Sequence, residues 1–185
     1  PRPWNDEDAD ALIALAKKIN KDQGFDYTLM DPLIKQLSYC CRGTINPMAA
    51  YLGGLVAQEA MKAISQEGAP LLQWHHVEFS EALPETDNID EDDFQPMGFR
   101  YDSNVVVFGN KVQQKILQQK TFLVGAGALG CEFVKNFAMT GVGCSKAGLI
   151  QVTDLDSIEL SNLSRQFLFR EQHVGKMKST IACQA

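Results

Sequence analysis

The glycine-rich segment Gly125-Ala126-Gly127-Ala128-Leu129-Gly130 constrains the fold of this 185-residue chain more than any other feature. It is a complete G-x-G-x-x-G that directly follows the apolar residues 121–124 and opens a helix-like stretch over residues 128–140. In this setting the first glycine permits a tight turn, the second lets the backbone approach a phosphate, and the third lets helix and strand lie close together. Backbone N–H groups at the helix start then face an anion, supported by the helix dipole. The segment predicts a strand, a phosphate-binding turn and a helix.

The residues around this turn predict an α/β fold with a parallel sheet. Residues 121–124 and 149–153 have the composition of short strands, and residues 128–140 form the expected helix between them. A helix over residues 104–119 is expected before the first strand, and another that starts near Glu171 is expected after the second. Strands that alternate with helices at this spacing form βαβ units, whose strands run parallel.

An acid follows the second predicted strand, at Asp154. In dinucleotide-binding folds an acid at this place accepts hydrogen bonds from ribose hydroxyls. The glycine segment and Asp154 together favour a nucleotide site over a turn that serves packing alone. These residues do not distinguish between NAD, FAD and ATP.

The polar residues after Asp154 favour a site that handles a triphosphate. A dehydrogenase has little use for Asn162 and Arg165 so soon after the ribose acid. An enzyme that adenylates a carboxylate must neutralise charge on the triphosphate while the α-phosphate is attacked. Arg165 offers a planar fork for this purpose and Lys178 a point charge.

The motif D-x-D-x-I-E-x-S-N-L-x-R-Q-F-L-F-R, followed by V-G-K-x-K-S, resembles the nucleotide loop of ubiquitin-activating enzymes and of bacterial relatives that adenylate sulfur-carrier proteins. The run F-L-V-G-A-G-A-L-G-C-E is similar to theirs as well. Upstream, I-N-P, Y-L-G-G, A-Q-E and M-K resemble the close of the inactive adenylation half of these enzymes. The resemblance covers nearly the whole chain, is most specific over residues 121–179 and is weakest over residues 1–44.

The resemblance implies an incomplete Rossmann-like adenylation fold of the ThiF/MoeB type, preceded by helices of an inserted bundle. Residues 1–44 would be the end of this helical insertion, and residues 45–84 the C-terminal part of the inactive half. Residues 85–100 would be an acidic linker, and residues 101–185 the N-terminal, nucleotide-binding part of the active half. Some relatives have, in the segment that corresponds to residues 100–109, an Arg that reaches the γ-phosphate in a partner's site. In this chain Asn104 occupies that region, as in the active halves of ubiquitin-activating enzymes.

The resemblance also implies a ligand set for ATP and Mg²⁺. Arg165 and Asn162 would be catalytic, and Asp156 is a candidate Mg²⁺ ligand, with the main Mg²⁺ ligand and the thioester cysteine outside this chain. The expected nucleotide-binding residues are Gly125, Gly127, Ala128, Gly130, Asp154, Asp156, Arg165, Gln166 and Lys178.

The implied activity is ATP-dependent adenylation of the C-terminus of ubiquitin, or of a close ubiquitin-like protein, before thioester formation and transfer to a conjugating enzyme. The chain by itself is expected to be inactive, and the parent protein to be cytoplasmic and nuclear. Two other functions stay open. One is a non-catalytic nucleotide-binding or scaffold subunit of the same fold. Inactive halves typically lack the set Asp156, Asn162, Arg165 and Lys178, all of which are present here. A dinucleotide oxidoreductase would bind NAD without Mg²⁺.

Composition argues against several classes of partner and site. A net charge of −6, from 23 acidic and 17 basic residues, argues against nucleic acids and membrane surfaces, which attract basic faces. Five cysteines without a C-x-x-C pair, and only three histidines, argue against a metal cluster and favour reduced thiols. Cys131 stands at the predicted helix start, where the dipole would lower its thiol pKa, but simple burial is the favoured interpretation.

The first hundred residues predict helices and an acidic connection. Helices are expected over residues 6–20, 31–41 and 46–65, and a strand over residues 71–79. Gly53 and Gly54 inside the third helix each cost about 1 kcal/mol, for which close helix packing would compensate. Residues 81–93 carry seven acids and no Lys or Arg, so they are expected to be solvated, mobile and protease-sensitive.

Overall fold

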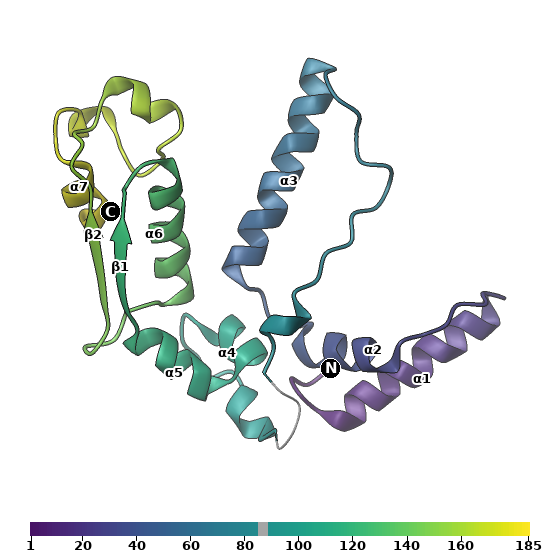
Figure 1. The fold of residues 1–185 in the computed structure, drawn as a ribbon. Helices are drawn as coiled ribbons and strands as arrows, with labels where there is room; N and C mark the ends of the chain where they lie inside the picture. The colour runs from purple at the N-terminus through teal and green to yellow at the C-terminus, as the bar shows by residue number, and fades with distance from the viewer. Residues whose placement is uncertain (85–88) are drawn as a thin grey trace. The chain divides into compact units, whose positions relative to one another are not determined.

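The computed structural model describes residues 1–84 and 89–185, which form two compact units, Pro1–Val112 and Gln113–Ala185 (Figure 1). The boundaries predicted at residues 44, 84 and 100 divide the chain by its resemblance to a known family. The two compact units do not test this division, so these boundaries stay predictions. No helix within the described residues is both long enough and apolar enough to cross a membrane.

The first unit begins with three helices whose positions confirm the sequence expectation: α1 (Asp6–Asp22), α2 (Asp31–Cys40) and α3 (Asn46–Ser65). The side chain of Asn5 caps α1 by accepting a hydrogen bond from the Asp8 N–H. The second and third helices each have Pro in the first turn, where the missing N–H costs nothing. Two short 3₁₀ helices, η1 (Ser80–Ala82) and η2 (Glu91–Phe94), lead to α4 (Asp102–Phe108).

A buried aromatic cluster joins distant parts of the first unit. The Trp4 ring lies 4.8 Å from the Tyr39 ring and 4.4 Å from the Phe94 ring, measured between centroids. Its indole Nε1 donates a 2.9 Å hydrogen bond to the Val106 carbonyl in α4. Trp4 also has a φ of 54°, an unfavourable backbone conformation for a bulky residue, which persists because the surrounding contacts fix it.

The second unit is built on two parallel strands, β1 (Lys120–Val124) and β2 (Leu149–Thr153), joined by α6 (Ala128–Thr140). Lys120 pairs with Leu149 and Val124 with Thr153, so the carboxyl ends of both strands lie at one edge. Helix α5 (Asn110–Gln118) crosses the boundary between the units. Buried Gln113 on α5 donates to the Thr140 carbonyl at the end of α6. The predicted βαβ unit is confirmed.

The connection from β2 to α7 (Lys178–Gln184) contains η3 (Leu160–Ser164) and η4 (Glu171–His173). Apolar residues of this connection form a core with the glycine turn, α6 and α7. The buried members of this core are Ala126, Cys131, Ile158, Phe169, Ile181 and Ala182. On the sheet, Phe122 and Val124 are exposed, at 62% and 74%. The core therefore supports the β2–α7 connection, while one face of β1 is open in this chain.

Two expectations about regular elements before the sheet are wrong. Residues 71–79 carry no strand, because their backbone bonds are local, such as the Gln73 N–H to the Leu71 carbonyl. The helix expected over residues 104–119 is divided into α4 and α5 at Gly109, whose φ of 83° ends the first of them.

The last helix begins at Lys178, where the sequence had predicted a start near Glu171. The Gly175 N–H donates to the Ile158 carbonyl, and the Ile158 N–H donates to the Lys176 carbonyl. Gly175 has a φ of 85°. These two bonds hold residues 175 and 176 beside Ile158 in a non-helical conformation, so the helix begins only after them.

The expectation that another helix packs closely against Gly53 and Gly54 of α3 is wrong for the described residues. No atom lies within 4 Å of the place where a Cβ would stand on Gly53 or Gly54, apart from the helix itself. No residue of α3 is buried in the described part of the chain. The cost of these two glycines is therefore not offset by contacts that the structure shows.

The acidic segment differs from a uniformly solvated linker at its C-terminal end. Residues 85–88 lie outside the described residues, whereas Phe94 in η2 is 95% buried, with an exposed fraction of 5%. The Asn5 Nδ2 donates to the Glu91 carboxylate, and the Lys111 backbone N–H donates to the Asp93 carboxylate. Polar partners therefore fix this end of the acidic run to α1 and α5.

Substitution of Trp4 tests how much the aromatic cluster contributes. We expect Trp4→Phe to lower the free energy of unfolding by about 1–3 kcal/mol, because it leaves the buried Val106 carbonyl without this donor. Trp4→Ala should cost about 3–5 kcal/mol, because it also leaves a cavity. Denaturant unfolding followed by circular dichroism measures both values. The control is Trp74→Phe, since Trp74 is 76% exposed. A loss no larger for Trp4→Phe than for this control would contradict the assigned role.

Candidate functional site

The glycine turn lies between the end of β1 and the start of α6, as the motif predicts. Gly125 has a φ of 103°, which favours glycine, and its N–H donates a 2.7 Å bond to the Thr153 carbonyl. A Cβ on Gly130 would stand 2.2 Å from the Gly125 carbonyl oxygen, so α6 can approach the turn only with glycine there. A Cβ on Gly127 would meet no atom within 4 Å. The turn is closed on its helix side and open beside Gly127.

Asp154 lies at the carboxyl end of β2 and is bonded directly to the glycine turn. Its Oδ2 accepts a 2.6 Å hydrogen bond from the Ala126 N–H, and its Oδ1 accepts a 2.8 Å bond from the Asp156 N–H. These two amides fix the orientation of the carboxylate. Each oxygen retains a lone pair that can accept a further hydroxyl hydrogen. This placement suits the predicted ribose contact.

Asp156 and Lys178 form an ion pair next to Asp154. The Lys178 Nζ lies 2.8 Å from the Asp156 Oδ2, and the Lys178 backbone N–H donates to the Asp156 carbonyl. Lys178 has an exposed fraction of only 7%, so its ammonium group needs this partner. Ser179 adds a 3.3 Å bond to the Asp154 carbonyl, a contact that the sequence motif did not single out. The start of α7 is thus fixed beside the glycine turn.

Asn162, Arg165 and Gln166 lie on or directly after η3, where they organise the β2–α7 connection. The Asn162 Oδ1 accepts a 3.0 Å bond from the Glu159 N–H and caps η3. The Arg165 Nη1 donates to the Ser161 carbonyl at 3.0 Å, while the Arg165 side chain stays exposed. Gln166 is 3% exposed, and its Oε1 has no hydrogen-bond partner among the described residues. A buried acceptor of this kind is suited to a donor from a ligand or water.

The structure brings one part of the predicted ligand set together through hydrogen bonds. A chain of hydrogen bonds links Ala126 in the turn to Asp154, Asp156 and Lys178. The side chains of Asn162 and Arg165 bond within their own segment. The predicted role of each residue in nucleotide binding stays a prediction.

Cys131 is buried in the first turn of α6. Its exposed fraction is 0%, and it belongs to the core that includes Phe169. Burial raises the pKa of the thiol, while hydrogen bonding from the Leu168 backbone opposes this rise. The effect is opposite to the activation that a helix start could give, so the packing interpretation holds.

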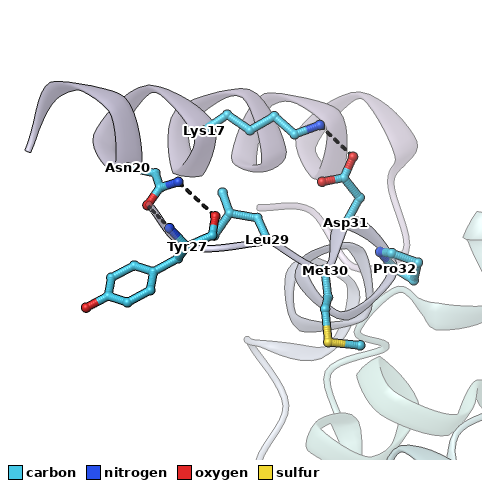
Figure 2. A pocket seen from close by; sticks show the side chains of 7 residues that line it. All are labelled: Lys17, Asn20, Tyr27, Leu29, Met30, Asp31 and Pro32. Carbon is cyan, nitrogen blue, oxygen red and sulfur yellow. Dashed lines mark hydrogen bonds and ion pairs between the residues drawn. The ribbon is translucent and has the colours of Figure 1, made fainter. Parts of the chain in front are cut away.

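The pockets of the first unit, which lies away from the glycine turn in sequence, include two of similar volume. One, of about 700 Å³, is lined mainly by apolar side chains of α2, α3 and residues 77–83. The other, of about 670 Å³, lies between α1 and α2 (Figure 2). Figure 2 shows the Lys17–Asp31 ion pair and the bonds between Asn20 and the Tyr27 backbone at its wall, with the Tyr27 ring turned outward. These contacts fasten the connection between the two helices.

The residues that the structure describes contain no group of three or more His, Cys, Asp or Glu side chains arranged to hold a metal ion. Asp156 is the acid that the sequence offers as a Mg²⁺ ligand, and here its Oδ2 faces Lys178. Its metal role stays a prediction.

Comparison with known proteins identifies the part of the chain that carries this site. Residues 101–185 match the ThiF family. These residues form a ThiF-family domain. The ThiF/MoeB-type fold class predicted from the sequence is thereby confirmed.

The whole chain is similar to one segment of ubiquitin-activating enzymes. It is 50% identical over 185 residues to ubiquitin-activating enzyme E1 1 of Schizosaccharomyces pombe. It is 48% identical over 189 residues to ubiquitin-like modifier-activating enzyme 1 of Homo sapiens. Each alignment covers 100% of this chain, and the chain spans 18% of the length of either relative. The resemblance predicted from the motifs is confirmed over the full chain.

Solved structures also overlap with part of the chain. A crystal structure of E. coli MccB with ATP is 28% identical and has a TM-score of 0.43. The overlap covers 51% of this chain and 30% of MccB.

The geometry of the turn predicts different costs for substitution of Gly130 and of Gly127. We expect Gly130→Ala to lower the free energy of unfolding by about 1–3 kcal/mol, because the added methyl would overlap the Gly125 carbonyl. Gly127→Ala should change it by no more than about 0.5 kcal/mol, because its Cβ meets open space at a φ of −76°. Thermal unfolding of both variants measures the difference. Equal losses would show that the close approach of α6 to the turn is not a constraint.

Proposed function

We propose that this chain supplies part of the ATP site of an enzyme that adenylates the C-terminus of ubiquitin or of a close ubiquitin-like protein. The observation that carries the proposal is the hydrogen-bonded series Ala126, Asp154, Asp156 and Lys178 at the glycine turn of a ThiF-family domain. It sets a carboxylate for ribose and an ammonium for phosphate beside a helix start. The similarity of the whole chain to ubiquitin-activating enzymes supports the choice of substrate.

The residues around the glycine turn fit a nucleoside triphosphate. The space beside Gly127 would admit a phosphate close to the backbone. The fixed carboxylate of Asp154 retains acceptor capacity for two hydroxyls. The buried Gln166 Oε1 is free to accept a donor. Gly125, Ala128 and Gly130 complete the turn in this assignment.

In the proposed reaction a carboxylate oxygen of ubiquitin attacks the α-phosphate of ATP, and pyrophosphate leaves. Arg165 and Lys178 would compensate the negative charge that develops on the phosphates. Arg165 is exposed and so can turn from the Ser161 carbonyl toward a ligand. Lys178 is held by Asp156, so its charge is already in place before the nucleotide arrives. Preorganised charges of this kind avoid the cost of reorganisation during the reaction.

Mg²⁺ would neutralise further phosphate charge, and Asp156 is the residue of this chain that we assign to it. A ubiquitin-conjugating enzyme is the proposed next partner, acting through domains of the parent protein beyond these residues. A cytoplasmic and nuclear location also belongs to this proposal.

Two other functions predict different behaviour. A non-catalytic scaffold of the same fold has no need for a buried lysine paired at the glycine turn, and Lys178 is 7% exposed. A dinucleotide oxidoreductase would bind NAD without Mg²⁺. Calorimetric titration of the parent protein with ATP–Mg²⁺ and with NAD separates the oxidoreductase from the other two functions. ATP–pyrophosphate exchange separates adenylation from a non-catalytic subunit, which binds nucleotide without turning it over.

Substitution of Asp154 tests the ribose assignment. In the parent protein we expect Asp154→Ala to weaken ATP binding by about 1–3 kcal/mol, because a charged hydrogen-bond acceptor is lost. Isothermal titration measures the change. Asp26→Ala, in the exposed connection between α1 and α2, is the matched control and should leave the affinity unchanged. An unaltered affinity in Asp154→Ala would rule out the ribose contact.

The isolated 185-residue chain should not catalyse the reaction. Its described sheet has two strands, and the exposed faces of Phe122 and Val124 lack neighbours there. Loss of one preorganised contact to developing charge typically costs about 10²–10³ in rate. The assay is ATP–pyrophosphate exchange with ubiquitin and Mg²⁺, in which the isolated chain is compared with the parent protein. Exchange at similar rates would show that these residues alone complete the site.

A further inference from the structure

An exposed aromatic ring stands directly after two of the proposed nucleotide ligands. Phe167 follows Arg165 and Gln166, and its ring lies 5.3 Å from the Nζ of Lys135. A lysine ammonium within about 6 Å of a ring centroid is attracted by the negative face of the ring. Lys135 is on α6, the helix that begins at the glycine turn. The contact therefore joins the β2–α7 connection to the helix that carries the turn.

The geometry of α6 explains why Lys135 reaches this ring. Side chains on a helix lean toward its N-terminal end, which here is the end at the glycine turn. In Figure 1 the connection between β2 and α7 lies at this same end of α6. Glu132, one turn earlier, forms an ion pair with the Lys135 Nζ and holds the ammonium group on that face.

The backbone around Phe167 is fixed by separate contacts. The Arg170 Nη1 donates hydrogen bonds to the Phe167 and Phe169 carbonyls. Phe169 is buried in the same core as Cys131, so this part of the connection is anchored to the inner face of α6. Leu163 and Leu168 pack against the same core. The Lys135–Phe167 contact adds a further attachment, nearer to Arg165 than Phe169 is.

We propose that Lys135 is a positioning residue, which holds Arg165 and Gln166 in place through its contact with the Phe167 ring. The proposal rests on the function proposed above, in which Arg165 compensates charge on the phosphates. Within the described residues, the Arg165 side chain donates a hydrogen bond to the Ser161 carbonyl of its own segment. Its position relative to the glycine turn therefore depends on what fixes the following residues. A misplacement of a catalytic group by about 1 Å can lower the reaction rate by about 10²-fold, so even partial loosening of this segment should be measurable.

The first test measures the segment itself and does not depend on activity. In the parent protein, Lys135→Met keeps most of the apolar stem and removes the charge. We expect amide hydrogen exchange of residues 165–169 to become about two- to fivefold faster, the factor that matches a cation–π contact at a partly exposed site. Lys146→Met, in the turn before β2, removes the same charge from an exposed residue and should leave this exchange unchanged. Unchanged exchange in Lys135→Met would overturn the proposal.

A double-mutant cycle assigns the effect to the ring. Phe167→Leu keeps an apolar side chain without an aromatic face, so it should accelerate the exchange as much as Lys135→Met does. The double variant should be no faster than either single variant, because both remove one interaction. Multiplied effects would show that Lys135 acts elsewhere, for example only on Glu132, and would contradict the proposal.

Activity provides the functional readout. We expect Lys135→Met to lower the ATP–pyrophosphate exchange rate at saturating ATP by about two- to fivefold. The KM for ATP should change less than the rate, because Arg165 acts on developing charge. Lys135→Arg should restore both rate and protection, since a guanidinium also binds an aromatic face. Faster amide exchange with an unaltered reaction rate would overturn the positioning role. If the unmodified protein shows no pyrophosphate exchange, the proposed function fails, and the amide measurements still decide whether the contact holds the segment.

Discussion

The hydrogen bond from the Gly125 N–H to the Thr153 carbonyl, 2.7 Å long, sets the geometry on which the candidate site depends. It is the last hydrogen bond of the parallel pairing of β1 and β2, because Thr153 is the residue paired with Val124. The glycine turn and Asp154 therefore emerge side by side at one edge. Because successive side chains of a strand point to opposite faces, a shift of one residue would turn Asp154 away from the Ala126 N–H.

The charged residues Asp154, Asp156 and Lys178 are linked to one another at this edge by hydrogen bonds and an ion pair. The Asp154 carboxylate accepts hydrogen bonds from the Ala126 and Asp156 backbone amides, whereas the ammonium group of Lys178 is almost fully buried and is paired with Asp156. Burial of an unpaired ammonium would be costly, so Asp156 has a structural reason to be present besides any contact with a metal. A ligand with several negative charges would meet a site whose positive group is already fixed. The same ion pair thus serves both the stability of α7 and the proposed chemistry.

Much of the ThiF-family domain could be predicted from the sequence because its signals are local. The strand before the glycine turn, α6 and β2 lie where composition and the G-x-G-x-x-G place them. The errors arose where an element depends on distant partners. Residues 71–79 have the composition of a strand, but no neighbouring strand bonds to them among the described residues. The expected helix near Glu171 is displaced because Gly175 and Lys176 bond to Ile158.

The strand–turn–helix order, the need for glycine at residues 125 and 130, and the acid after β2 could all be inferred from the residues alone, because each depends on backbone conformations a few residues long. Which polar groups satisfy one another emerges in the folded chain. Trp4 donates to Val106 across 102 positions, Lys178 pairs with Asp156, and Lys135 meets the ring of Phe167. None of these partners is specified by spacing or composition. For Trp4 and Lys178 the choice follows from burial, since a polar group withdrawn from water must find whichever partner the folded chain brings within reach.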